Sequence, residues 1–187
     1  MGVLLVASKS DTASMTLYRA MMRLDGWSKP FSTTFGDYYI HECDSVYLLV
    51  IDQIHVRADN IDTLFKKQTG LSVDDVLILS RHVSRSNTPA MTLHAIGIPG
   101  ILPYGEEGIS GGKNGLLVPP SKYFASLFRR MNKLARGKKL DLDFDLTLET
   151  THHGPILTTP TLYIEIGSTE DEWVREDVAD CWAEVIS

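Results

Sequence analysis

Four of the six histidines lie in polar segments beside apolar runs, and imidazole is the commonest neutral metal ligand in proteins. They are His82, His94, His152 and His153. His82 follows the apolar run 74–79, and His94 comes shortly before a glycine-rich segment. The spacing matches no standard zinc motif, because the sequence has neither HExxH nor HxE with a downstream PCxxC. Two interpretations therefore stay open, a metal site or a set of hydrogen-bonded turn residues.

Two glutamates could join these histidines. Glu165 interrupts the apolar run 162–166, and an unpaired buried carboxylate is costly. Alternation along a strand puts Ile164 and Ile166 on the opposite face. Glu165 therefore either faces water or meets a cation, a metal ion or a proton donor. Glu149 poses the same question less sharply, because it ends its apolar run.

Two other chemistries are disfavoured by the motifs that the sequence lacks. Ser80, Ser84 and Ser86 flank His82, which suggests a serine nucleophile, but no GxSxG elbow is present. The glycine-rich string 111–115 lacks the GxxxxGK[ST] pattern of a phosphate-binding loop. Neither a serine hydrolase nor a nucleotide-binding P-loop is expected.

The charge of the chain is unevenly distributed. Its 187 residues include 18 basic and 24 acidic side chains, a net charge of −6 that argues against a general nucleic-acid coat protein. The segment 122–139 nevertheless holds seven basic residues and no acidic one. They are Lys122, Arg129, Arg130, Lys133, Arg136, Lys138 and Lys139. We interpret them either as a solvated helix face or as a surface that binds phosphates.

Apolar runs and helical spacings alternate along the chain, which predicts an α/β fold. Strands are expected at 3–7, 45–51, 74–79, 145–149 and 161–166. Helices are expected at about 13–24, at 121–137 with Ser121 as N-cap, and at 170–185 with Ser168 or Thr169 as N-cap. In such folds, sites form beyond the carboxyl ends of the strands, where the four histidines would converge. The segment 96–115, with seven of the fourteen glycines between 97 and 115, is predicted to be a functional loop.

Cysteines and apolar runs limit the class of protein. Cys43 and Cys181 form no CxxC, which excludes a disulfide scaffold and suits a reducing compartment. No apolar run approaches the roughly 18 residues of a membrane span. The first apolar run has no basic region before it, so we expect a buried strand rather than a signal peptide, and a cytoplasmic protein.

Four blocks, taken in order, resemble a known family: 80–86 (SRHVSRS), 89–94 (PAMTLH), 149–155 (ETTHHGP), and 160–170 followed by Trp173. They resemble the archaeal and plant type of D-aminoacyl-tRNA deacylase. The resemblance implies a three-layer α/β/α fold of the phosphorylase/hydrolase type, with a mixed, largely parallel sheet. It also implies hydrolysis of the ester that links a D-amino acid to tRNA, with zinc as cofactor.

The sequence departs from the family pattern at two places. Ile98 follows Gly97 where the family usually has asparagine. Family chains also continue past the closing helix into a glycine-rich block with a GGGHY-like motif, whereas this sequence ends at Ser187. We therefore expect one hydrolase-like domain over 1–187, without that block.

Carried onto this sequence, the resemblance implies a candidate site at His82, His94, His152, His153 and Glu165. The metal ligands are expected to be His82, His152 and Glu149, and the catalytic residues Glu165, His153 and His94. The seven basic residues of 122–139 are expected to bind tRNA. Zinc would activate water, with Glu165 or a histidine as general base and glycine-loop amides stabilising the oxyanion. The alternatives are a catalytically silent tRNA-binding module or a hydrolase of another ester or amide; either a monomer or a homodimer is compatible with the sequence.

Overall fold

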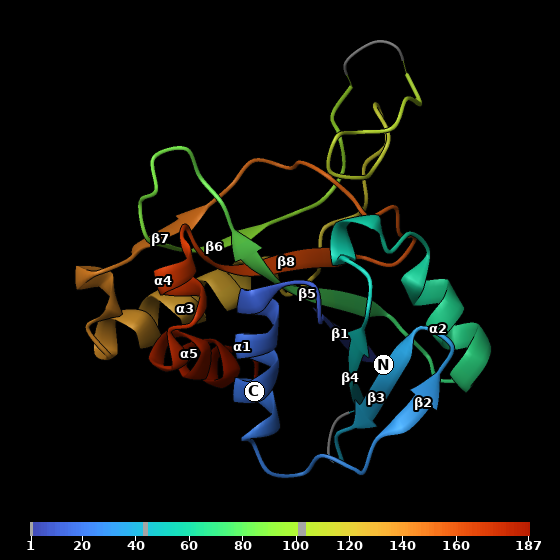
Figure 1. The fold of residues 1–187 in the computed structure, drawn as a ribbon, viewed down its shortest axis with the longest axis horizontal. Helices are drawn as coiled ribbons and strands as arrows, with labels where there is room; N and C mark the ends of the chain where they lie inside the picture. Colours follow the sequence, from blue (N-terminus) through green and yellow to red (C-terminus); the bar gives the residue numbers. More distant parts are fainter. Residues whose placement is uncertain (1, 43–44, 101–103) are drawn as a thin grey trace.

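The computed structural model describes residues 2–42, 45–100 and 104–187. Its centre is an eight-stranded sheet with the strand order β2-β3-β4-β1-β5-β8-β6-β7 (Figure 1). The strands are β1 (Val3–Ser8), β2 (Phe31–Thr33), β3 (Gly36–Ile40), β4 (Val46–Ile51), β5 (Asp75–His82), β6 (Ala90–His94), β7 (Asp145–Leu148) and β8 (Thr161–Gly167). The helices are α1 (Thr12–Met22), α2 (Ile61–Thr69), α3 (Phe124–Gly137), α4 (Glu170–Trp173) and α5 (Glu176–Ile186), with 3-10 turns at 55–57 and 140–142.

The sheet is mixed and mostly parallel, which confirms the predicted fold class. β4, β1, β5 and β8 run parallel to one another at its centre. β3 is antiparallel to β4, and β6 is antiparallel to β8 but parallel to β7. The four central strands therefore bring their carboxyl ends to one edge, where β6 and β7 run in the opposite direction.

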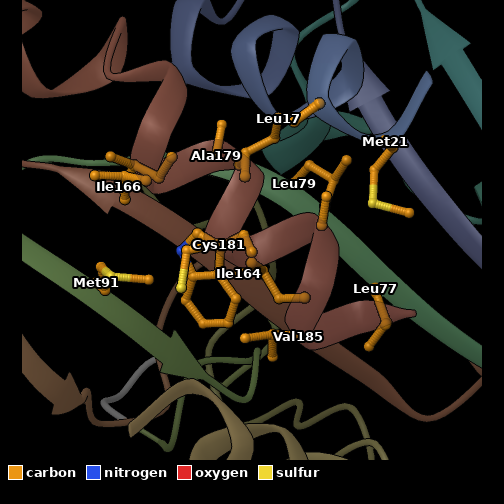
Figure 2. Packing of buried hydrophobic residues seen from close by; sticks show 14 of the residues in the cluster. Leu17, Met21, Leu77, Leu79, Met91, Ile164, Ile166, Ala179, Cys181 and Val185 are labelled. Atoms are coloured by element: carbon orange, nitrogen blue, oxygen red, sulfur yellow. The ribbon is translucent and has the colours of Figure 1, made fainter. Parts of the chain in front are cut away.

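Helices cover both faces of the sheet, so the fold has three layers. On one face, α1, α3 and α5 bury a core that includes Leu79 and Ile164 (Figure 2). On the other face, α2 and the turn at 55–57 pack over Ile78 and Tyr163. Successive strand residues thus alternate between the two layers, as the pleat requires. Glu165 follows this alternation and points to the same face as Tyr163, away from α3.

The predicted closing helix is wrong in one respect, because it is split in two. The chain leaves the helical conformation at Arg175, whose ψ is 99°, so α4 and α5 are separate. Thr169, not Ser168, is the N-cap of α4 and forms a capping box with Glu172. The Trp173 indole N–H donates to the His82 carbonyl at 3.0 Å and ties α4 to β5. Periodicity cannot report such a contact, because it depends on the tertiary fold.

The second helix of the helix-rich face also begins later than predicted. Tyr123, rather than Ser121, occupies the N-cap position of α3. The Ser121 hydroxyl still accepts the Tyr123 backbone N–H at 3.1 Å, so its side chain stabilises the turn before the helix. Cys181 is buried in the helix-rich core, whereas Cys43 lies outside the described residues. Within the described residues, every helix is too short or too polar to cross a membrane.

Candidate active site

A pocket of about 320 Å³ lies at the carboxyl ends of β5 and β8, on the side of the sheet that faces away from α3. Its lining includes five of the predicted site residues, namely His82, Glu149, His152, His153 and Glu165. The sixth, His94, is fully buried and contacts these side chains. All six metal and catalytic candidates therefore gather at one place in the described structure.

Strand register explains this convergence. β5 and β8 are parallel and pair Ser80 with Glu165 and His82 with Gly167. On the other side of β8, antiparallel β6 pairs His94 with Tyr163. The loop after β7 then adds Glu149 and the two consecutive histidines. The site thus extends along β8, from its carboxyl end back to Tyr163.

Glu165 meets two cationic partners instead of water, which settles the question raised by its apolar strand. The residue is 3% exposed, and its carboxylate lies 3.4 Å from His82 Nδ1 and 3.5 Å from His94 Nε2. Burial disfavours the charged form, but the two imidazoles outweigh it and hold the pKa of Glu165 far below its ordinary value. Glu165 is therefore a carboxylate at neutral pH.

His82 is held between two carboxylates. Its Nδ1 lies 2.8 Å from Glu149 Oε1 as well as 3.4 Å from Glu165 Oε2. Burial alone would lower the pKa of His82, but the two glutamates raise it to about 9. In the metal-free protein His82 is therefore a cation at neutral pH. His94 has the same balance, with burial opposed by Glu165, and its pKa is also raised.

A second group, formed by His94, His152 and His153, consists of histidines alone. The rings of His94 and His152 stack with centroids 4.2 Å apart, and the ring of His153 packs edge-on against both. Burial and the neighbouring His94 lower the pKa of His153 to about 4. His153 is therefore a neutral imidazole beside charged groups.

The tautomers of these three rings can be assigned from their backbone partners. Nδ1 of His94 lies 3.0 Å from the Ala95 carbonyl, that of His152 2.7 Å from the Thr150 carbonyl, and that of His153 2.6 Å from the Gly154 carbonyl. A carbonyl oxygen only accepts hydrogen bonds, so each Nδ1 carries a hydrogen. In the neutral ring Nε2 then keeps its lone pair, which is the arrangement that metal-binding histidines adopt.

The residues fit a divalent metal ion. Two groups each place three ligand atoms within 4.8 Å of one another: His94, His152 and His153 form one, and His82, Glu149 and Glu165 form the other. Nitrogen and carboxylate oxygen are the donors that zinc accepts. The buried His94 Nε2 makes no hydrogen bond within the described residues, and it lies 3.5 Å from Glu165 Oε1. The sequence predicted these residue types but not their division into two groups.

The glycine-rich segment packs directly against the histidine loop. Gly154 N–H donates to the Ser110 carbonyl at 3.1 Å, and Gly97 N–H donates to the His153 carbonyl at 2.9 Å. Gly111 has a φ of 74°, and a Cβ there would lie 1.9 Å from the Val56 carbonyl oxygen, so only glycine fits. The described part of the predicted loop 96–115 therefore reaches the pocket through Ser110, whereas 101–103 lie outside the described residues.

Comparisons with known proteins identify the family of this chain. A family model described as D-aminoacyl-tRNA deacylase matches residues 69–187. The D-aminoacyl-tRNA deacylase of Arabidopsis thaliana is 37% identical over 188 residues, which cover 98% of this chain and 57% of the relative. That of Thermococcus onnurineus is 31% identical over 184 residues, which cover 98% of this chain and 64% of the relative. The chain belongs to the D-aminoacyl-tRNA deacylase family. It therefore spans about three fifths of the length of these family members.

Two solved structures superpose on this chain and identify its fold. The crystal structure of the conserved protein of unknown function AF0625 superposes with a TM-score of 0.84 at 27% identity, covering 99% of this chain and 61% of that one. The Campylobacter jejuni 5′-methylthioadenosine/S-adenosyl homocysteine nucleosidase superposes with a TM-score of 0.52 at 10% identity, covering 100% and 96%. The second likeness shows the fold alone and confirms the phosphorylase/hydrolase-like architecture.

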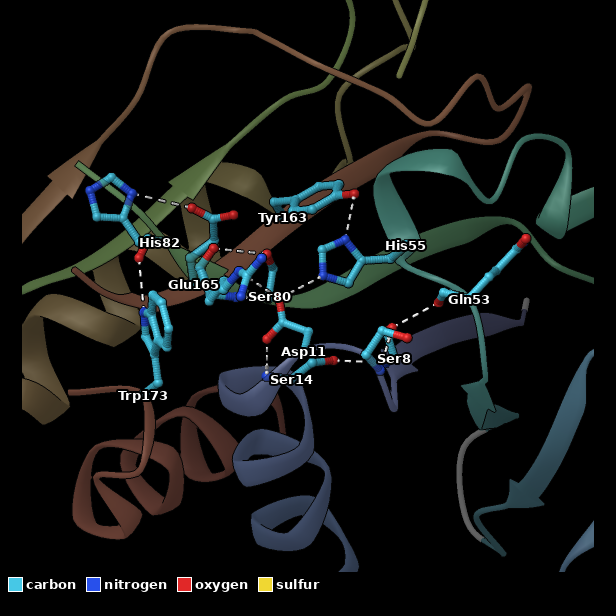
Figure 3. Close-up of polar contacts among 12 residues, drawn as sticks. Ser8, Asp11, Ser14, Gln53, His55, Ser80, His82, Tyr163, Glu165 and Trp173 are labelled. Atoms are coloured by element: carbon cyan, nitrogen blue, oxygen red, sulfur yellow. Dashed lines mark hydrogen bonds and ion pairs between the residues drawn. The ribbon is translucent and has the colours of Figure 1, made fainter. Parts of the chain in front are cut away.

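The sequence did not predict three further residues of this site: Asp11 and His55, which line the pocket, and Tyr163, which contacts His55 and His94. Asp11 accepts the Ser14 N–H at 2.8 Å as the N-cap of α1 and accepts the His55 Nε2–H at 3.2 Å (Figure 3). The Tyr163 hydroxyl lies 3.1 Å from His55 Nδ1, and its ring stacks on His94 with centroids 5.0 Å apart. Burial raises the pKa of Tyr163 well above its ordinary value, so the hydroxyl stays protonated and donates. Only the polar character of the segment after the first strand hinted at Asp11.

The basic residues of 122–139 lie on a different layer from the pocket. All seven side chains are exposed on or around α3. The buried side of α3, including Leu127 and Met131, packs into the helix-rich core. The pocket lies on the opposite face of the sheet, so the structure does not bring the predicted tRNA-binding residues and the predicted catalytic residues together.

Proposed function

We propose that this chain hydrolyses the ester between a D-amino acid and the 3′ end of tRNA, as a step in translation quality control. The observation that carries the proposal is the pairing of buried His94 with buried Glu165, beside the half-buried ring of His153, in a chain of the deacylase family. The neutral imidazole of His153 can accept one of the two protons that ester hydrolysis moves, and the imidazole of His94, paired with Glu165, can donate the other.

The proton transfers follow from the tautomers. His153 Nε2 bears a lone pair and takes the proton from the water that attacks the ester carbonyl carbon. The bond from that carbon to the tRNA 3′ oxygen then breaks, and His94 Nε2 gives its proton to the leaving oxygen. Glu165 keeps His94 protonated through its low pKa, so it acts as the orienting carboxylate rather than as the base. Amides of the glycine-rich segment are suited to stabilise the oxyanion.

We further propose that His82, His152 and Glu149 hold zinc. The position of Glu149 between the two histidines supports this ligand set: Glu149 Oε1 lies 2.8 Å from His82 Nδ1, and Glu149 Oε2 lies 3.6 Å from His152 Nε2. Bound by these residues, zinc would supply a Lewis acid able to polarise the ester carbonyl and lower the pKa of water. These three ligands leave the proton-transfer residues free.

The basic face of α3 is proposed to bind tRNA away from the ester. Arg136 and Lys138 already pair with Asp141 and Glu184, whereas Arg129, Arg130 and Lys133 form no ion pair within the described residues. Exposed cations of this kind bind phosphates with a strong dependence on salt. A substrate that is charged tRNA places the protein in the cytoplasm, where translation occurs.

The test is release of tyrosine from matched D- and L-tyrosyl-tRNA, with zinc added and with a chelator. We expect loss of the D-ester alone, abolished by the chelator and restored by zinc, with the L-side chain rejected sterically. If folded protein hydrolyses neither ester but binds tRNA in a salt-dependent way, the chain is a tRNA-binding module rather than an enzyme. Cleavage of small amino-acid esters without preference for D-tyrosyl-tRNA would indicate another hydrolase.

A further inference from the structure

Among the described residues that line the pocket, Arg81 is the one arginine or lysine. It lies on β5 between Ser80 and His82, so its backbone position is fixed by the central sheet. Its side chain is 41% exposed, and the residue lines a pocket whose other charged groups are carboxylates and histidines. The proton-transfer scheme gives this cation no role.

The Arg81 side chain is held in place from two sides. Its guanidinium carbon lies 5.1 Å from the centre of the Trp173 ring, and that ring is fixed by the indole N–H bond to the His82 carbonyl. On the other side, Arg81 Nε lies 3.7 Å from Asp11 Oδ2. An arginine stacked on an aromatic ring loses less conformational entropy when it binds a ligand.

The two terminal nitrogens of Arg81 remain available. No hydrogen bond or ion pair from Nη1 or Nη2 occurs within the described residues. By contrast, the nearby Arg57 pairs with Glu107 and donates to the Ile109 carbonyl. Asp11 only partly neutralises the charge of Arg81, because the fully buried Asp11 carboxylate also accepts hydrogen bonds from Ser14 and His55. A fixed guanidinium with two free donor groups matches the geometry of a phosphate.

In an aminoacyl-tRNA, a phosphate lies on the same ribose as the ester that is hydrolysed. The scissile ester is on the 3′ oxygen of the terminal adenosine, and the nearest phosphate is on the 5′ oxygen of the same ribose. None of the seven basic residues of 122–139 lines the pocket, whereas Arg81 does. Resting on the function proposed above, we propose that Arg81 binds the 5′ phosphate of the terminal nucleotide. The pocket then selects a nucleotide ester over a simple amino-acid ester.

Binding of two analogues that cannot be hydrolysed tests this assignment without turnover. Both carry D-tyrosine as an amide on 3′-amino-3′-deoxyadenosine, and one also carries a 5′-monophosphate. With zinc at a fixed concentration, the unaltered chain should bind the phosphorylated analogue about 10- to 100-fold more tightly, since hydrogen bonds to charged groups have that strength. Arg81→Gln should remove most of this preference, and Arg81→Lys should keep part of it because a lysine retains the charge but not the paired donors.

A matched control uses Arg19, an exposed arginine on α1 whose side chain bonds only to Thr16 in the described structure. Arg19→Gln should leave the preference for the phosphate unchanged, and circular dichroism should show that all variants are folded. An equal preference in Arg81→Gln and the unaltered chain, or no preference in the unaltered chain, would overturn the assignment.

Turnover separates this proposal from the proposed function. On D-tyrosyl esters of adenosine and of adenosine 5′-monophosphate, Arg81→Gln should raise KM for the phosphorylated ester alone, about 10- to 100-fold. An equal loss on both esters would assign Arg81 a general structural role and overturn the proposal. If the unaltered chain hydrolyses neither ester yet binds the phosphorylated analogue through Arg81, the phosphate site stands and the hydrolase function fails.

Discussion

The pocket and the basic face of α3 both concentrate charge, but they hold it in opposite ways. In the pocket, the buried Glu165 pairs with the buried His94 and with the half-buried His82. On α3, side chains such as Arg129 and Arg130 are exposed to water. Burial shifts pKa values and fixes geometry, which chemistry requires. Exposed charge is screened and adaptable, which suits long-range attraction to a polyanion.

The largest expected effect comes from removing the neutral imidazole of the pocket. His153 has a φ of 45°, in the left-handed region that asparagine tolerates, so His153→Asn removes the base with little backbone strain. We expect kcat for D-tyrosyl-tRNA to fall by about 10²- to 10⁴-fold, the usual contribution of a general base. Zinc content should be unchanged, as measured by atomic absorption. Loss of zinc along with activity would make His153 a ligand instead.

Removing a proposed zinc ligand should weaken zinc binding while leaving the other contacts of the pocket in place. His152→Ala leaves Glu149 and His82 in contact but deletes one imidazole. We expect zinc affinity to fall at least about tenfold and activity to recover in part at high zinc concentration. Calorimetric titration of the metal-free protein measures this. An unchanged affinity would remove His152 from the ligand set.

A buried carboxylate outside the pocket sharpens the comparison, because it tests whether burial alone makes a site. Asp62 on α2 is 1% exposed and accepts hydrogen bonds from Thr158 and Thr159. Burial favours the neutral form, but these donors outweigh it and lower the pKa of Asp62. Asp62→Asn should cost about 1–3 kcal/mol of unfolding free energy at pH 7 and leave kcat unchanged.

The pH dependence of this loss follows from the direction of the pKa shift. A carboxyl whose folded pKa is depressed stabilises the protein above its unfolded pKa of about 3.9 and loses that stabilisation as the pH falls through the folded value. The difference in unfolding free energy between the unaltered chain and Asp62→Asn should therefore become smaller below about pH 4. Urea unfolding at pH 7 and pH 3 measures it. A difference that is constant with pH would mean that lost packing, not charge, causes the destabilisation.

The smallest effect is expected on α3. Arg129→Ala with Arg130→Ala should weaken tRNA binding several-fold and lower the slope of log K against log salt by about 1.4–1.8, since each phosphate contact contributes roughly 0.7–0.9. Hydrolysis of a D-tyrosyl ester of adenosine should not change. Filter binding over a range of salt concentrations gives the slope, and an unchanged slope would refute the role of α3.

The sequence predicted the types of the site residues and the main strands, because long apolar runs and polar strand ends are local signals. It missed β2 and β3, which are short and partly exposed, and β6, whose five residues carry His94. Whether Glu165 faced water depended on its burial, which periodicity leaves open. The contacts of His55 with Asp11 and Tyr163 span 44 and 108 positions. No local pattern encodes such separations, nor the face of the sheet on which α3 packs.

The central claim is that the paired charges of the pocket carry the hydrolysis. It is tested most directly by the initial rate of D-tyrosine release from D-tyrosyl-tRNA, comparing the zinc-loaded unaltered chain with Glu165→Gln. Removing this carboxylate leaves His82 and His94 without their shared partner. We predict release by the unaltered chain and a loss of about 10²-fold or more in the folded variant. Equal rates for the two proteins would contradict the account and place the chemistry elsewhere.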